Sequence, residues 1–151
     1  MTGALQAIVW GGAACAILDG LATSLQFGRK GIRPLRVWQG VASGLLGEPA
    51  FREGWLSGGF GVLLHGAIAF TVAAVFVEAC GWTRFLLRAY WVSGPVYGVL
   101  VFLVMNLFVL PLSARPNRPR SSPDVILQVI IHALFVGLPI AMAANRFTSP
   151  G

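Results

Sequence analysis

The sequence predicts an all-α integral membrane protein, a bundle of four membrane-spanning helices with one further amphipathic helix in its first loop. Of the 151 residues, 56% are hydrophobic and only 11% are charged, less than half of the roughly 25% charged residues that a soluble domain carries. The apolar residues also gather into four long blocks. This composition excludes a soluble globular enzyme, a disordered chain and a disulfide scaffold, and the length fits one transmembrane domain over 1–151.

The four predicted spans cover 4–27, 56–79, 89–112 and 125–145. Each is as long as the roughly 20 residues that a helix needs to cross the hydrocarbon core. Aromatic residues at headgroup depth are typical of such spans, and they stand here as Trp82, Tyr90 and Trp91 at one interface and Trp38, Phe51 and Trp55 at the other. We expect a short turn over 80–88 and Asp124 as the N-cap of the fourth span.

The first loop contains a predicted helix at 34–47 that is too short to cross the bilayer. Apolar residues recur there at helical spacing, as at Leu35, Trp38 and Val41, and polar residues and glycines occupy the other face. At about 1.5 Å per residue this segment falls well short of the roughly 30 Å hydrocarbon core. It is therefore predicted to be an interfacial or re-entrant helix. A surface anchor is favoured over a lid above the bundle.

Basic residues are distributed unevenly between the two sides of the predicted bundle. Eight lie in the loops 28–55 and 113–124, namely Arg29, Lys30, Arg33, Arg36, Arg52, Arg115, Arg118 and Arg120, against Arg84, Arg88 and Arg146 on the other side. The positive-inside rule places these two loops in the cytoplasm. The net charge of +6 therefore indicates lipid headgroups as the partner of the basic residues, and no nucleic acid is expected.

Each predicted span contains one polar residue whose burial in the hydrocarbon core is energetically unfavourable, so we expect each to have a structural or functional role. They are Asp19, His65, Asn106 and His132, and Gln128 lies one helical turn before the last of them. Counted from the ends of their spans, the four lie roughly 9–14 Å below the surface of the first and third loops. The sequence therefore predicts one buried polar layer.

Three interpretations of this layer are open. In the first, the polar side chains hydrogen-bond to one another and fix the packing of the helices. In the second, Asp19 and the two imidazoles form a proton- or ion-linked site, because histidine titrates near neutral pH and desolvation changes how readily a carboxylate ionises. In the third, His65 and His132, on alternate helices, bind a haem, or bind a metal together with Asp19.

The sequence favours a structural or assembly module, with proton-linked transport or sensing as the alternative and haem or metal binding third. Gly94 and Gly98 form a GxxxG spacing that is typical of close helix packing, so a homo-oligomer or a larger membrane complex is a candidate partner. We find none of the motifs G-x-S-x-G, H-E-x-x-H, G-x-G-x-x-G, CxxC or a P-loop. We therefore expect no enzymatic activity and no resident cofactor.

The second half of the chain resembles a family of small bacterial inner-membrane proteins. The stretch His65–Phe70, then Tyr97-Gly98 through Asn106 to Pro111, and then His132 through Gly137-Leu138-Pro139 is similar to the YagU-like kind, over about 56–145. The resemblance implies a multi-pass four-helix protein of the bacterial cytoplasmic membrane. It implies no catalytic residues.

Overall fold

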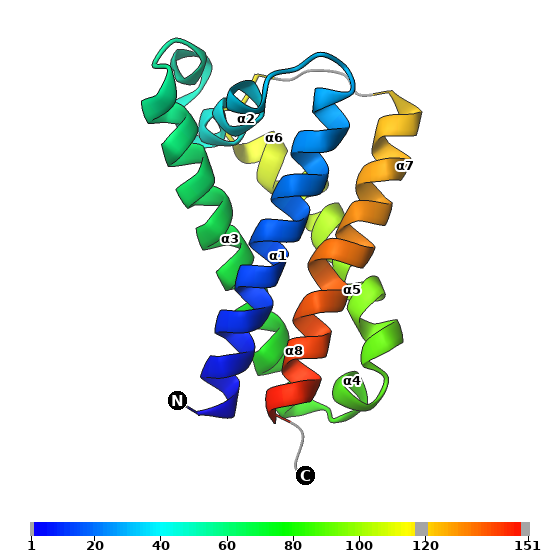
Figure 1. The fold of residues 1–151 in the computed structure, drawn as a ribbon. Coiled ribbons are helices and arrows are strands. Elements are labelled where there is room, and N and C mark those ends of the chain that lie inside the picture. Colours follow the sequence, from blue (N-terminus) through cyan, green and yellow to red (C-terminus); the bar gives the residue numbers. More distant parts are fainter. Residues whose placement is uncertain (1, 117–120, 149–151) are drawn as a thin grey trace.

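The computed structural model describes residues 2–116 and 121–148, and every regular element in these ranges is helical. The elements are α1 (Gly3–Gly28), α2 (Pro34–Leu46), η1 (Glu48–Phe51), α3 (Trp55–Trp82), α4 (Phe85–Arg88), α5 (Tyr90–Val104), η2 (Met105–Val109), α6 (Leu110–Leu112), α7 (Ser122–Ile131), η3 (His132–Gly137) and α8 (Leu138–Thr148) (Figure 1). The all-α prediction is confirmed.

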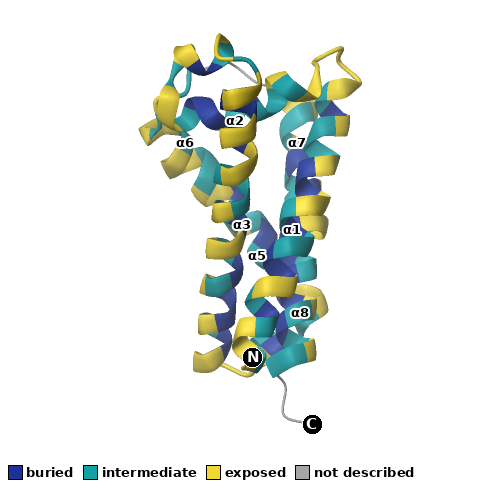
Figure 2. Ribbon diagram, turned by 60° about the vertical axis from the view of Figure 1, so that its left-hand side comes forward, coloured by how far each residue is buried: buried dark blue, intermediate teal, exposed yellow. Residues whose placement is uncertain are grey.

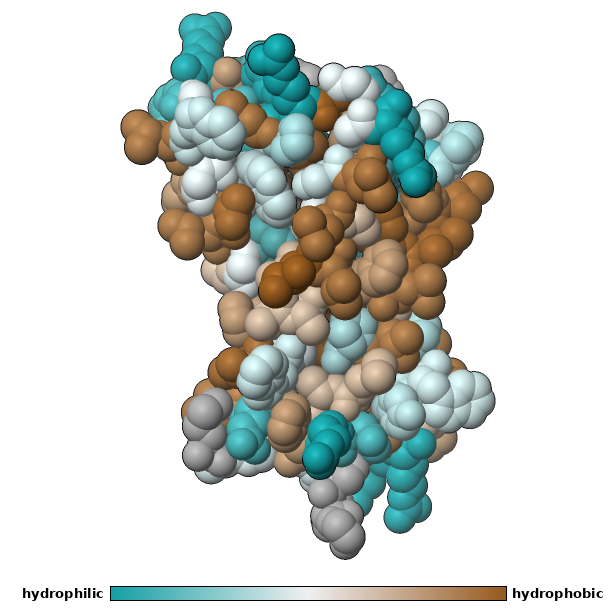
Figure 3. All heavy atoms as spheres, viewed as in Figure 1, coloured by the Kyte–Doolittle hydropathy of each residue, from teal (hydrophilic) through white to brown (hydrophobic). Residues whose placement is uncertain are grey.

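Four helical segments are long and apolar enough to cross a membrane, within a residue or three of the predicted bounds: Gly3–Gly28, Trp55–Trp82, Tyr90–Leu112 and Ser122–Thr148. Large apolar side chains cover their outer surface. In the space-filling view, hydrophobic residues form a broad band between hydrophilic ends (Figure 3). An exposed apolar surface of this extent indicates contact with lipid.

The spans run up and down, so that both termini lie at the end opposite α2 (Figure 1). α1 packs against α3 on one side and against η3 and α8 on the other, and α5 packs against η3 and α8. α3 meets α5 where the ring of Phe76 contacts that of Tyr97, 4.9 Å between centroids, and the Tyr97 hydroxyl donates to Val72 O at 2.7 Å.

The buried core toward the termini contains many alanines (Figure 2). Gly94, Gly98 and Gly137 allow α5 to touch the fourth span, because a Cβ on Gly98 would lie 2.1 Å from His132 O and one on Gly137 would lie 1.9 Å from Gly94 O. The GxxxG pair therefore serves helix packing within the chain. It is already covered, so a second copy has no access to this face.

Two spans contain π-helical turns, and each turn ends two residues before a proline. Leu110 N donates to Met105 O and Leu138 N donates to Ala133 O, five residues back, and Pro111 and Pro139 follow. Proline has no N–H, and its ring clashes with the carbonyl four residues earlier in an α-helix. A wider turn relieves that clash, which explains where the π turns occur.

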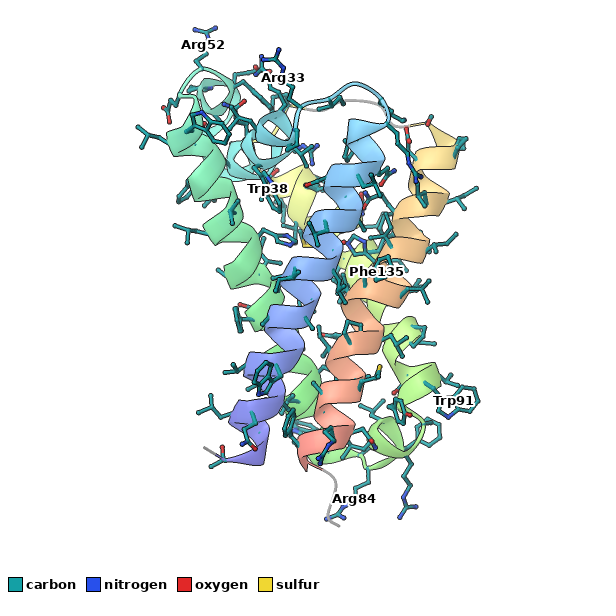
Figure 4. The ribbon with its side chains drawn as sticks, viewed as in Figure 1. Arg33, Trp38, Arg52, Arg84, Trp91 and Phe135 are labelled. Atoms are coloured by element: carbon teal, nitrogen blue, oxygen red, sulfur yellow. The ribbon has the colours of Figure 1, made fainter. Side chains whose placement is uncertain are left out.

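Three local predictions are wrong. α3 runs on to Trp82 and α4 follows it, so residues 80–88 are mostly helical. Asp124 is not an N-cap: α7 begins at Ser122, preceded by Ser121, and the Asp124 carboxylate accepts from Ser121 Oγ at 2.5 Å within the first turn. Trp38 does not belong to an interfacial belt, because it points into the bundle (Figure 4). Arg118 and Arg120, two of the eight basic residues that predict a cytoplasmic side, lie outside the described residues.

Candidate functional site

A cavity of about 1600 Å³ lies in the half of the bundle that carries α2. α2 and α3 line one side, α5, η2 and α6 line the other, and α1 and α7 complete the wall. It exceeds the roughly 300–1,000 Å³ of common small-molecule sites. Its walls are mostly apolar, so the polar groups that do line it stand out as the candidates for chemistry.

α2 lines this cavity and packs against the start of α3. Pro34 begins the helix, and Gly47, with φ of 64°, ends it. Gly61 lets α2 approach closely, since a Cβ there would lie 2.0 Å from Trp38 O. The buried Gln39 amide donates to Gly54 O at 3.0 Å. The helix is therefore packed on the bundle and lines the cavity.

Three residues of the predicted polar layer meet deep in the cavity. Asp19 on α1 is only 8% exposed. Its Oδ2 lies 3.8 Å from His65 Nε2 on α3, and its Oδ1 lies 3.9 Å from His132 Nδ1 at the start of η3. One carboxylate thus lies between two imidazoles contributed by two other spans.

Both imidazoles are held by backbone carbonyls. His65 Nε2 lies 3.1 Å from Ala16 O, and His132 Nδ1 lies 3.0 Å from Gln128 O. A carbonyl only accepts, so each of these nitrogens carries the hydrogen. The same two nitrogens face Asp19, beyond hydrogen-bond range. Asp19 Oδ1 is buried without a hydrogen-bond partner among the described residues.

Aromatic rings close over each histidine. The rings of Trp38 and His65 meet edge to face with centroids 5.4 Å apart, and those of Phe102 and His132 do so at the same distance. Gly20 makes room for Trp38, because a Cβ there would lie 2.8 Å from its ring. The contact of Trp38 with His65 was not predicted, because a tryptophan in the short helix of the first loop fits an interfacial residue equally well.

The remaining predicted residues lie in the same cavity but make other hydrogen bonds. Asn106, in the π turn η2, lines the cavity, and its amide donates to Phe102 O at 2.8 Å. Gln128 donates to Gln26 Oε1 at 2.6 Å, and Gln26 donates to Asp124 O at 3.4 Å. Gln26 was missed, although it lies seven residues after Asp19 and therefore on the same face of the helix.

The mouth of the cavity is basic. Lys30 pairs with Asp124. Arg36 donates to Phe51 O at 3.0 Å and lies over the Phe51 ring. Arg33, Arg115 and Glu48 also line this end. Figure 4 shows Arg33 at the upper end of the molecule, above Trp38. Four basic side chains, Lys30, Arg33, Arg36 and Arg115, stand here against two carboxylates, Glu48 and Asp124, so this end of the cavity has a net positive charge.

The arrangement also bears on the cofactor hypothesis. The Asp19 carboxylate occupies the space between His65 and His132, so a haem iron bound by both imidazoles would have to displace it. Among the described residues, no group of three histidine, cysteine or acidic side chains is arranged to hold a metal ion. Haem or metal binding stays a prediction.

Comparison with known proteins gives no relative: no family model, no curated protein and no solved structure matches this chain.

Proposed function

We propose that this chain is a multi-pass protein of a bacterial cytoplasmic membrane that carries protons through a cluster of Asp19, His65 and His132, in a cavity that also binds a ligand. The loops at 28–55 and 113–124 would be cytoplasmic, so the cavity would open toward the cytoplasm. The observation that carries the proposal is the buried carboxylate between two imidazoles, deep in a cavity that reaches the surface.

The chemistry follows from the cost of burying charge. A buried carboxylate is destabilising unless it is paired or hydrogen-bonded. Oδ1 of Asp19 is buried from solvent and accepts no hydrogen bond from the described residues. When either imidazole takes up a proton, it becomes a cation within 4 Å of that carboxylate. Histidine titrates in the physiological range as a class, so the cluster suits proton uptake and release.

Each imidazole N–H lies between a carbonyl and the carboxylate. His65 contacts Ala16 O and His132 contacts Gln128 O, and in both cases the same nitrogen faces Asp19. A modest rotation of the ring would transfer the hydrogen bond from the carbonyl to the carboxylate. Protonation would therefore change how α1 is bonded to α3 and to the fourth span, which is the step that transport or sensing requires.

The structural interpretation is the second candidate, and one observation favours it. Gln26 and Gln128 are both buried and bond to each other across α1 and α7, which fixes the register of these helices without any titration. This pair accounts for the glutamines. It does not account for Asp19, whose buried oxygen gains no such bond.

The experiment compares proton flux in vesicles that enclose a pH-sensitive dye and carry a potassium diffusion potential. We expect wild-type protein to speed acidification above empty vesicles and Asp19→Asn to abolish the increase. Asp124→Asn is the matched control, because it removes a carboxylate from the mouth of the same cavity and should retain the flux. Wild-type flux equal to that of empty vesicles, or flux that persists in Asp19→Asn, would refute proton transport through this cluster.

A further inference from the structure

The cavity has an apolar side opening between α3 and α5. α3 packs on α1 and α2, and among the described residues it touches the third span chiefly at Phe76 and Tyr97. That contact closes the lower end. The upper end is closed where Ala114 N donates to Gly44 O at 2.9 Å.

Between these two closures, apolar side chains from both helices line the cavity, among them Leu64 and Ile68 on α3 and Val101, Met105 and Val109 on the third span. They are half-buried or exposed, although they face a cavity. In a bilayer an opening at this depth faces acyl chains, which are as apolar as leucine. A hydrocarbon chain can therefore enter from the side without crossing water.

The mouth above this opening is suited to a negative headgroup. Arg33 and Arg36 at the start of α2 line this end together with Arg115 and Glu48, while Asp124 is already paired with Lys30. Arginine binds phosphate and carboxylate through two parallel hydrogen bonds. The basic mouth and the apolar side opening are the two ends of one cavity.

We infer that the ligand is an amphiphile with one anionic headgroup and an acyl chain, taken from the membrane: the headgroup lies at Arg33 and Arg36, and the chain lies between α3 and α5. This inference rests on the cavity being the ligand site of the proposed function, but not on its proton linkage. A soluble anion would leave the apolar walls unfilled, and a cationic amphiphile would meet the arginines. The volume of about 1600 Å³ is on the scale of a lipid-like ligand and above that of common small-molecule sites, roughly 300–1,000 Å³.

Native mass spectrometry of the detergent-purified full chain tests this with three probes: oleoyl-lysophosphatidylglycerol, oleoyl-lysophosphatidylcholine and glycerol 3-phosphate. We expect one molecule of the anionic lysolipid to bind about tenfold more tightly than the zwitterionic one. Both probes carry the same phosphate group, but the choline cation of the second would lie beside the arginines and be repelled by them. Glycerol 3-phosphate should not bind at matched concentration. Equal binding of the two lysolipids, or binding of glycerol 3-phosphate as tight as that of the anionic lysolipid, would overturn the inference.

Paired variants separate the cavity from lipid bound around the outside. Leu64 lines the cavity, whereas its neighbour Leu63 is 73% exposed on the outer surface. Leu64→Trp should lose most of the bound lysolipid and Leu63→Trp should retain it. If Leu64→Trp does not stay monodisperse, Ile68→Trp fills the same opening. Equal retention in the cavity-filling and outward-facing variants would show that the lipid is only peripheral, and the inference would be wrong.

Charge variants test the headgroup site. Arg33→Gln/Arg36→Gln should remove the preference for the anionic lysolipid, and Arg84→Gln/Arg88→Gln, which removes the same charge from the opposite end of the molecule, should keep it. A preference that survives the first pair would refute the arginine site. Lysolipid binding without Asp19-dependent proton flux would refute only the proton transport. Proton flux without a preference for the anionic lysolipid would refute only this inference.

Discussion

Substitution of Gly98 by alanine tests whether α5 and η3 are in direct backbone contact. The added Cβ would lie 2.1 Å from His132 O, 2.7 Å from His132 C and 2.8 Å from Ala133 Cα. Real Cβ atoms essentially never come within 3.0 Å of another group, and all three atoms belong to backbone, so no side chain can move aside. The two helices must separate by almost an ångström along this contact.

The magnitude follows from two opposing effects. Alanine is better than glycine inside a helix by about 0.8–1.0 kcal/mol, whereas overpacking typically costs about 1–3 kcal/mol and sometimes more. Backbone contacts on every side place Gly98→Ala at the upper end, so we expect a net loss of about 2 kcal/mol. At roughly 2–4 °C per kcal/mol for a chain of this size, the melting temperature should fall by several degrees.

The assay is thermal unfolding of the detergent-purified protein, followed by tryptophan fluorescence, with Gly59→Ala as the control. Gly59 is also inside a span, but a Cβ there meets nothing within 4 Å. It should leave stability unchanged or raise it by up to about 1 kcal/mol. If Gly98→Ala proves as stable as Gly59→Ala, the close contact between α5 and η3 does not exist and the arrangement of the third and fourth spans is wrong.

Two further predictions concern the polar groups. Gln26→Leu and Gln128→Leu should each lower the free energy of unfolding by about 1–3 kcal/mol, because each leaves the buried amide of the other glutamine unpaired. In a double-mutant cycle, the double variant should lose less than the sum of the two single losses. Additive losses would contradict the hydrogen bond between the two side chains. Trp38→Ala should speed the modification of His65 by diethyl pyrocarbonate, measured by peptide mass spectrometry. The control Trp55→Ala, at a tryptophan that is 80% exposed, should not change this rate. Equal modification rates in the two variants would mean that Trp38 does not cover the imidazole.

The spans were predictable because membrane insertion imposes a length and a polarity that a sequence states directly. Trp55–Trp82 and Tyr90–Leu112 were placed within three residues, since charges, prolines and glycines surround each apolar block. The common depth of Asp19, His65 and His132 was also predictable, because the rise per residue converts position into depth. Their facing directions were not, since depth does not fix rotation about the helix axis.

What escaped prediction depends on contacts between distant segments. Trp38 occupies a position that suits a headgroup-level aromatic, and only the space left by Gly20 on another helix turns it toward His65. Gln26 lies near the end of an apolar block, where a polar residue needs no partner, and its bond to Gln128 joins residues 102 positions apart. Such pairings are set by tertiary packing, which periodicity within one helix does not record.

The two π turns connect the cavity to the core. A π turn contains one residue more than an α-helical turn, which rotates everything after it by about 100° relative to an uninterrupted helix. In the fourth span this shift lies between His132, which faces Asp19, and Ile140 and Ala144, which are fully buried in the core. Without it, one straight helix face would have to serve both the polar cavity above and the close apolar packing below. The same device recurs in the third span, where Asn106 lies inside the turn that precedes Pro111. Pro111 and Pro139 therefore do more than end or bend helices, because each favours a π turn and so an extra residue at its depth. The resulting rotation lets one part of each span point polar groups into the cavity while the remainder of the span stays packed.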